Sequence, residues 1–390
     1  MTTLQRPRIE SIDLLKGLVM VVMALDHTRD YFHFSAFFFD PTDPSQTTWP
    51  IYFTRWITHY CAPTFCFLAG TSAFLVGLRK SKNELSGFLL KRGLWLVVIE
   101  LTVVNFAWYF DVHFSSPGLL VIWSLGISMI VLAGLVYLPR VAILAFSLVI
   151  IFGHNLLDTI HFQGNYLWAI LHDPAIFTYS ETSRLYIFYP IVPWIAVMSL
   201  GYCFGALYEP AFDPAKRKRW LSFIGFSAIA LFFLLRGINM YGNPTKWIGY
   251  ESFSQSMMSF MDPAKYPPSL LYLLMTLGPA LVFLAATENQ KGKVTGFFST
   301  FGRVPFFYYI LHIYLIHILA MVAAQLTGFG WQRMLLGDWV GAIPELKGYG
   351  FSLVVVYLVW IAVILALYPL CKQFDQYKAS NRARWWLSYL

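Results

Sequence analysis

Two ionisable side chains, Lys16 and His27, interrupt the first long apolar segment of the chain. On a helix, a separation of eleven residues is close to three whole turns, so both side chains would share one face, about 16 Å apart along the axis. This arrangement suits a thread-like substrate lying along the helix, with Lys16 holding a phosphate or carbonyl group and His27 meeting the reactive end. The structural alternatives are a snorkelling lysine near the helix end and an interfacial histidine capped by Asp26.

A second apolar segment carries Arg55 and His59, which are four residues apart and therefore on one helix face. Both residues fall towards the end at which His27 is also expected. Histidines, a carboxylate and a guanidinium at similar depth can supply acid–base catalysis and stabilise an oxyanion. We therefore predict a catalytic set of Asp26, His27, Arg55 and His59. The structural alternative for Arg55 is an anchor at the membrane interface.

Later segments contribute weaker candidates. Arg92 lies at the start of a third apolar segment, on the side where a coenzyme phosphate would arrive. Arg303 and His312 occur in the stretch 301–312, and His312 is surrounded by apolar residues. We predict a donor-binding set of Lys16, Arg92, Arg303 and His312. Anchoring at the membrane surface explains Arg92 equally well, and His312 is equally consistent with a structural histidine.

We expect no metal ion, because no spacing of histidine, cysteine and carboxylate residues resembles a known metal site. The sequence shows no P-loop and no GxGxxG or GxSxG motif in a suitable context. The four cysteines lie within or beside apolar segments and include no CxxC pair, so we interpret them as small buried apolar side chains. Ionisable side chains inside the apolar segments are therefore the candidate functional groups.

The composition indicates an integral membrane protein. Of 390 residues, 58% are hydrophobic and only 12% are charged, whereas soluble domains carry about 25% charged residues. No polar or low-complexity linker divides the chain, so we predict a single domain over residues 1–390. The net charge of +8 does not indicate nucleic acid as a partner. The basic residues form short clusters between apolar runs, the pattern that orients membrane segments.

A helix needs about 20 mostly apolar residues to cross a bilayer, and about ten segments meet this description. They lie near 12–28, 52–78, 86–110, 118–138, 141–157, 185–208, 220–236, 267–287, 304–326 and 349–371. Loops on the side of the N-terminus hold most of the lysine and arginine, including Arg6, Arg8 and the run 216–219. The positive-inside rule then places both ends in the cytoplasm. The predicted fold is an all-α bundle of about ten transmembrane helices.

The loops on the opposite side differ in length and character. They are long and interleave Trp, Tyr, Asn, Asp and Pro, and they span 29–50, 158–184, 237–266 and 327–348. Aromatic and amide side chains on an extracytoplasmic face suit stacking on sugar rings and hydrogen bonding to them. An aromatic belt at the membrane interface is the structural alternative for most of them.

The run 11–17 and the pair Asp26–His27 resemble the amino-terminal signature of transmembrane acyltransferases. In that signature ten residues separate a basic residue from a histidine, as they separate Lys16 from His27. The stretches 55–70, 88–92 and 301–312 resemble the same superfamily in the same order. Within it, the chain most resembles bacterial membrane proteins related to the catalytic domain of heparan-alpha-glucosaminide N-acetyltransferase.

The resemblance implies a tunnel that admits acetyl-CoA or another acyl-CoA from the cytoplasm, and transfer of the acyl group to an extracytoplasmic sugar or glycan. It marks Lys16 and Arg92 as donor-binding residues and His27 as catalytic. In the lysosomal enzyme the histidine lies in the first luminal loop, where this chain offers His33, out of register. The choice among His27, His33 and His59 therefore stays open.

We accordingly expect an acyl-CoA-dependent acyltransferase of the bacterial inner membrane, with oligomeric state left open. In the favoured mechanism, His27 is a general base oriented by Asp26, and Arg55 or His59 stabilises the oxyanion. A secondary transporter is the main alternative, although such proteins usually show two related halves, which are not evident here. A non-catalytic scaffold would leave the buried Lys16, His27 and Glu100 unexplained.

Overall fold

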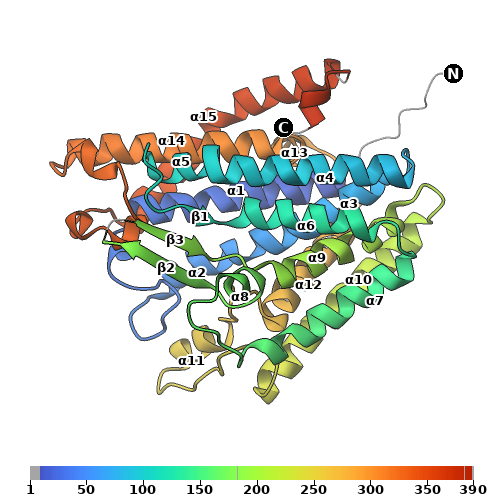
Figure 1. The fold of residues 1–390 in the computed structure, drawn as a ribbon, viewed down its shortest axis with the longest axis horizontal. Coiled ribbons are helices and arrows are strands. Elements are labelled where there is room, and N and C mark those ends of the chain that lie inside the picture. The colour runs from blue at the N-terminus through green and yellow to red at the C-terminus, as the bar shows by residue number, and fades with distance from the viewer. Residues whose placement is uncertain (1–8, 182, 382, 389–390) are drawn as a thin grey trace.

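The computed structural model describes residues 9–388 except 182 and 382, so Arg6 and Arg8 lie outside the described residues. The protein is mostly helical, with a small sheet at one end of the bundle (Figure 1). The longer helices are α1 (Glu10–Phe32), α3 (Cys61–Gly77), α4 (Lys82–Ile99), α6 (Val121–Leu135), α7 (Arg140–Gly153), α9 (Ile191–Phe204), α10 (Pro214–Ile238), α12 (Leu270–Thr287), α13 (Lys293–Arg303), α14 (Pro305–Leu326) and α15 (Leu353–Ser380). The shorter ones are α2 (Trp49–Trp56), α5 (Asn105–Tyr109), α8 (Tyr166–Leu171) and α11 (Phe253–Phe260).

Seven helical segments of the described chain are long and apolar enough to cross a membrane. They are Trp49–Gly77, Arg140–Leu157, Ile191–Tyr208, Pro214–Ile238, Leu270–Thr287, Pro305–Leu326 and Leu353–Ser380. Large apolar side chains remain exposed on their outer faces, for example Val149, Phe226, Leu326 and Val354. Exposing so much apolar surface to water is unfavourable, so these faces indicate contact with lipid. The prediction of a helical integral membrane protein is confirmed.

The other three predicted segments also coincide with helices. Segment 12–28 lies within α1, and 118–138 contains α6. Segment 86–110 covers most of α4 and its continuation through a π-helical turn, Glu100–Val104, into α5. At this turn the Glu100 carboxylate is fully buried and accepts a hydrogen bond from the backbone N–H of Trp123, with Oε2 at 2.9 Å.

Two predicted boundaries differ because short extended segments precede the helices. A three-stranded sheet in the order β1-β3-β2 forms from β1 (Gly118–Leu119), β2 (Ala175–Ser180) and β3 (Ser183–Ile187). Strand β3 pairs antiparallel with β2 and parallel with β1. The segments predicted to begin at 118 and 185 therefore begin as strands, and α9 starts only after Pro190, whose ring removes a backbone donor and is tolerated at a helix start.

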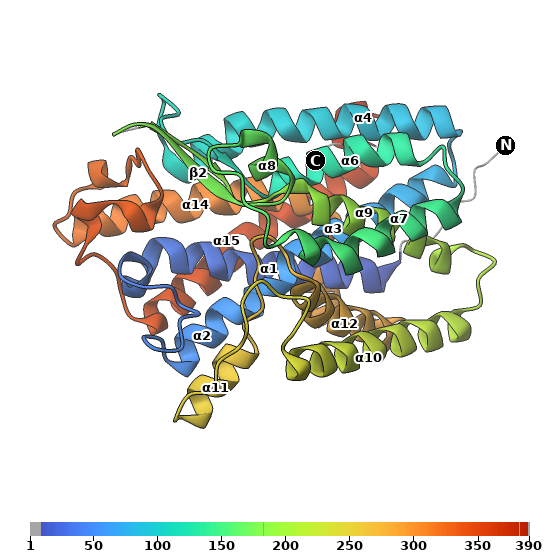
Figure 2. The ribbon, with the colours of Figure 1, turned by 60° about the horizontal axis from the view of Figure 1, so that its bottom comes forward.

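Helix α1 runs through the middle of the bundle. It packs against α3, α12, α13, α14 and α15, so side chains on several of its faces are enclosed by other helices. The small sheet, α2, α11 and the loop after α14 gather at the end opposite the N-terminus (Figure 1). In the second view, α10 and α12 lie along one edge of the molecule (Figure 2).

Helices α1 and α13 touch backbone to backbone at a pair of glycines. A Cβ atom added at Gly17 would lie 1.8 Å from the carbonyl oxygen of Phe298, and one at Gly302 would lie 1.8 Å from that of Asp13. Neither position has room for a methyl group. Close approach of this kind is typical of helix pairs in membranes, where small residues let backbones come together. It fixes α1 against α13 one residue away from Lys16.

Candidate active site

A largely apolar cavity of about 230 Å³ runs beside α1. Lys16 and Arg92 line one part of it, and Asp26 and His27 line another. The Nζ atom of Lys16 donates a hydrogen bond to Oγ of Ser72 at 2.7 Å. Lys16 and His27 are thus both accessible from one cavity, and the helical rise separates them by about 16 Å. We call this space the inner cavity.

A second cavity, of about 560 Å³, lies at the C-terminal end of α1, away from Lys16. We call it the outer cavity. Its wall is rich in aromatic side chains, including Phe37, Trp108 and Trp339. Six residues line both cavities: Asp26, His27, Val121, Tyr189, Lys265 and Tyr309. His27 therefore lies where the two cavities meet.

His27 is held by a second histidine, His312 of α14. Nδ1 of His27 lies 2.8 Å from Nε2 of His312, and the two rings are nearly parallel, with centroids 4.9 Å apart and an interplanar angle of 10°. This separation fits an in-plane hydrogen bond between ring edges rather than face-to-face stacking. Trp108 packs edge-on against His27, with ring centroids 4.7 Å apart.

The partners of His312 determine which nitrogen carries each proton. Nδ1 of His312 lies 3.0 Å from the backbone carbonyl oxygen of Tyr308, which can only accept, so this nitrogen is protonated. In a neutral His312, Nε2 is then an acceptor, and Nδ1 of His27 must donate to it. In a neutral His27 this leaves the lone pair on Nε2. The tautomer required of a general base is therefore set by the backbone of α14 through His312.

Asp26 does not make the contact that the sequence led us to expect. Its carboxylate accepts from two guanidinium groups, from Arg55 at 2.5 Å and from Arg29 at 3.0 Å. Arg29 also pairs with Asp30 at 2.5 Å. Asp26 is thus held between two cations, while the ring nitrogen of His27 pairs with His312. Both arginines and both aspartates line the outer cavity.

The remaining predicted residues lie away from the cavities. His59 is buried, and its ring packs against Tyr272 with centroids 5.5 Å apart. Arg303 is bonded through Nε to Asp375 of α15 at 2.6 Å. His312 is fully buried behind His27. Of the other predicted residues, Lys16 and Arg92 line the inner cavity and Arg55 the outer one, whereas Asp26 and His27 line both.

His33, the alternative histidine, has a local structural contact. It precedes the 3₁₀ turn Phe34–Phe37, and its Nδ1 accepts from the backbone N–H of Ser35 at 3.3 Å and lies 2.5 Å from the Ser35 hydroxyl. Burial, together with the nearby Arg29 cation, lowers the pKa of His33 to about 4. His33 lines neither cavity among the described lining residues.

The sequence reasoning missed Lys265, which lines both cavities beside His27. The signal that could have found it is its place in the stretch 237–266, predicted to be an outer loop, because a lysine on the side where few positive charges are expected calls for a specific reason. Arg29, in the predicted outer loop 29–50, was also missed. It is buried and paired with Asp26 and Asp30.

Fold and site together define an integral membrane protein with ionisable groups facing cavities inside a helical bundle. Residues 8–240, more than half of the chain, match the family of heparan-alpha-glucosaminide N-acetyltransferase catalytic domains. The chain belongs to this family, and it is therefore an acyltransferase of a membrane-bound type. No curated protein sequence matches the chain significantly.

Proposed function

We propose that the protein transfers an acyl group, in the first instance acetyl, from cytoplasmic acyl-CoA to an extracytoplasmic sugar or glycan. The supporting observation is the meeting of two cavities at His27, one containing Lys16 and Arg92 and the other walled by aromatic side chains. A donor entering from one side and an acceptor entering from the other would meet at this imidazole. The family match supports the acetyl group and the sugar.

The direction of transfer follows from a proposed topology of ten spans with both ends in the cytoplasm, in a bacterial inner membrane. The seven apolar spans, together with α1, α4–α5 and α6, make up this number. Lys16 then lies near the cytoplasmic end of α1, and the outer cavity opens on the other side. Reporter fusions after Lys82, Arg219, Lys293 and Leu390 should report cytoplasm, and a fusion near Asp43 the opposite side. Any of the first four on the outer side contradicts this topology.

The donor is held at the inner cavity in this proposal. Lys16 and Arg92 attract the negatively charged phosphates of coenzyme A, and the apolar walls take the uncharged arm. Arg303 and His312 stay outside this set, because Arg303 pairs with Asp375 and His312 with His27. We assign His312 as a positioning residue that keeps His27 in the reactive tautomer.

In the transfer step, Nε2 of His27 removes a proton from the acceptor hydroxyl or amine. The acceptor atom bonds to the thioester carbonyl carbon, and the resulting oxyanion is stabilised by nearby cations, Lys265 above all. The carbon–sulfur bond then breaks, and the protonated His27 returns the proton to the departing thiolate. Arg55 is already committed to Asp26, so it shapes the electrostatics of the outer cavity rather than acting directly.

The experiment uses the purified full chain in lipid nanodiscs with labelled acetyl-CoA. Glucosamine and a methyl glucoside serve as amine and hydroxyl acceptors, and both free coenzyme A and labelled sugar are measured. Labelled sugar that requires His27 supports the proposal. Hydrolysis of acetyl-CoA without any labelled acceptor across a panel of sugars and glycans overturns the sugar assignment. If acetyl-CoA is neither bound nor consumed, the acyl-CoA assignment itself is wrong.

A further inference from the structure

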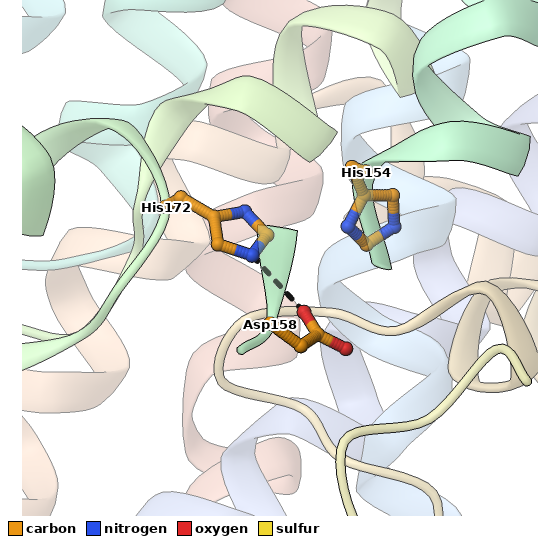
Figure 3. A group of neighbouring side chains, drawn as sticks. All are labelled: His154, Asp158 and His172. Carbon is orange, nitrogen blue, oxygen red and sulfur yellow. Dashed lines mark hydrogen bonds and ion pairs between the residues drawn. The ribbon is translucent and has the colours of Figure 1, made fainter. Parts of the chain in front are cut away.

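Three potential metal ligands meet at the end of α7, on the side of the bundle that carries the outer cavity. His154 and Asp158 lie at and just after the 3₁₀ turn His154–Leu157, and His172 directly follows α8. One ligand atom from each residue lies within 4.8 Å of those of the other two. Figure 3 shows the two imidazole rings and the carboxylate as close neighbours, with a contact between His172 and Asp158.

The histidines of this cluster are deeply buried and poorly hydrogen-bonded. His154 is 3% exposed and His172 is 2% exposed. Among the described residues, neither ring nitrogen of His154 and not Nδ1 of His172 has a hydrogen-bond partner. Buried polar atoms without partners are rare and costly, typically by about 1–3 kcal/mol each. A neutral imidazole has a single lone pair, so a cation bound by both rings would remove this cost at the one His154 nitrogen that it binds.

The carboxylate of Asp158 is oriented by a hydrogen bond from outside the cluster. Oδ1 of Asp158 lies 3.0 Å from Nε2 of His172, and Oδ2 accepts from Nδ2 of Asn155 at 2.7 Å. Asn155 in turn accepts from the backbone N–H of Leu270 at 2.9 Å. Such supporting bonds orient ligating side chains in established metal sites. This one connects the cluster to the start of α12.

We propose that His154, Asp158 and His172 bind a divalent transition-metal ion, with Zn²⁺ as the ion that this donor set fits. Two imidazoles and one carboxylate are a common zinc set, with a fourth position taken by water. Two ligand atoms on one tetrahedral zinc lie about 3.4 Å apart when the bonds are near 2.1 Å, a few tenths of an ångström more than the 3.0 Å between Oδ1 and Nε2. Mg²⁺ and Ca²⁺ prefer oxygen ligands and should bind poorly.

The role of this ion is to fasten the outer loop 158–184 to the end of α7. The three ligands come from both sides of α8, so one ion joins the loop's beginning to the segment leading into β2. None of the three lines the inner or outer cavity among the described lining residues. Because it lies apart from both cavities, we expect this ion to stabilise the loop and to take no part in acyl transfer.

Metal binding is tested on the full chain in detergent, with any affinity tag removed because tags bind zinc. Zn²⁺ affinity is measured by competition with a chromophoric chelator, and Co²⁺ is used as a spectroscopic probe of tetrahedral nitrogen and oxygen ligation. His172→Ala and Asp158→Asn should abolish stoichiometric binding, and Asn155→Ala should weaken it by about 10–100-fold. Zn²⁺, but not Mg²⁺, should raise the Tm of the wild type.

His161→Ala is the matched control. His161 belongs to the same loop but pairs with Asp173 at the surface, with 64% of its side chain exposed. The His161→Ala variant should bind zinc like the wild type. The proposal is overturned if the wild type binds no more zinc than His172→Ala, or if His161→Ala loses the metal equally. Size-exclusion profiles and the metal-free Tm identify a misfolded variant, and Asp158→Asn, which keeps the side-chain shape, then decides the outcome.

Discussion

Two histidine pairs occur in this protein, and they differ in how their nitrogens are used. His27 and His312 are bonded to each other, and a backbone carbonyl fixes the proton on His312. In the pair His154 and His172, three of the four ring nitrogens have no partner among the described residues. The first pair lies beside two cavities, whereas the second is enclosed by α7, α8 and the start of α12.

The difference separates two kinds of chemistry. A fixed tautomer with one lone pair facing a cavity is what proton transfer requires, because the base must present the same nitrogen in every cycle. One lone pair from each imidazole and a carboxylate oxygen, close together in an enclosed place, are what a metal ion requires. The prediction is that substitutions in the two clusters affect separate properties, turnover in one and metal content in the other.

His27→Ala should have the largest effect. If its imidazole is the general base, turnover should fall by about 10²–10⁴-fold, the usual contribution of a positioned acid–base group. Acetyl-CoA binding, measured by calorimetry, should persist because Lys16 and Arg92 remain. His172→Ala should retain turnover in the same activity assay and lose its metal in the zinc-binding measurement. This result would establish the separation of the two clusters.

The other histidines provide graded controls for that experiment. His59→Ala should lose less activity than His27→Ala, and His33→Ala least, since neither is among the described residues that line the inner and outer cavities. Near-normal turnover in His27→Ala, together with loss in either of the others, would refute the assignment of the base. Retention of activity by all three variants would exclude a histidine mechanism.

Lys265→Met should have the next largest effect. A cation that stabilises the developing oxyanion acts on the transition state, and loss of one such group typically lowers kcat by about 10²–10³-fold. KM for the donor should change little. Lys246→Met, at an exposed lysine of the same outer loop, is the control and should behave as wild type. An unchanged kcat in Lys265→Met would show that Lys265 does not stabilise the oxyanion.

Lys16→Ala should have the smallest effect, confined to donor affinity. Loss of a charged contact with phosphate or carbonyl should cost about 1.5–3 kcal/mol, which corresponds to a roughly 10–150-fold weaker Kd for coenzyme A. Lys293→Ala, at the exposed start of α13, should not alter Kd. Unchanged affinity in Lys16→Ala would show that Lys16 is an interfacial anchor. The cavity beside the His27–His312 pair would then have lost one of its two proposed donor-binding residues.

The helical membrane architecture could be predicted from sequence because span length and apolar runs are local properties. The segments around α12 and α14 were predicted within three residues, and the one around α10 within six. The short strands β1 and β3 could not be, because their pairing joins residues 118 and 186, far apart in the chain. Their apolar residues continue directly into the following helices, so periodicity alone does not separate them.

The candidate site was predictable along one helix and not between helices. Lys16 and His27 share α1, so the period of the helix was enough to align them. The contact of His27 with His312 depends on the packing of α14 against α1, and no spacing within the sequence encodes it. The proposed metal site could not be predicted for the same reason. His154 and Asp158 are four residues apart, as on one helix face, but His172 is brought to them by the fold of the loop 158–184.

The contact between Gly17 and Gly302 limits how this sequence can evolve. At each glycine, the backbone of the other helix occupies the space that a side chain would need. Neither glycine can therefore change without separating α1 from α13. Lys16 is the neighbour of Gly17, so a mutation that enlarges either glycine would also move the lysine. The two glycines therefore form a single unit of selection, and the sequence of α13 is constrained by the neighbouring helix α1, whose next residue, Lys16, lines the inner cavity.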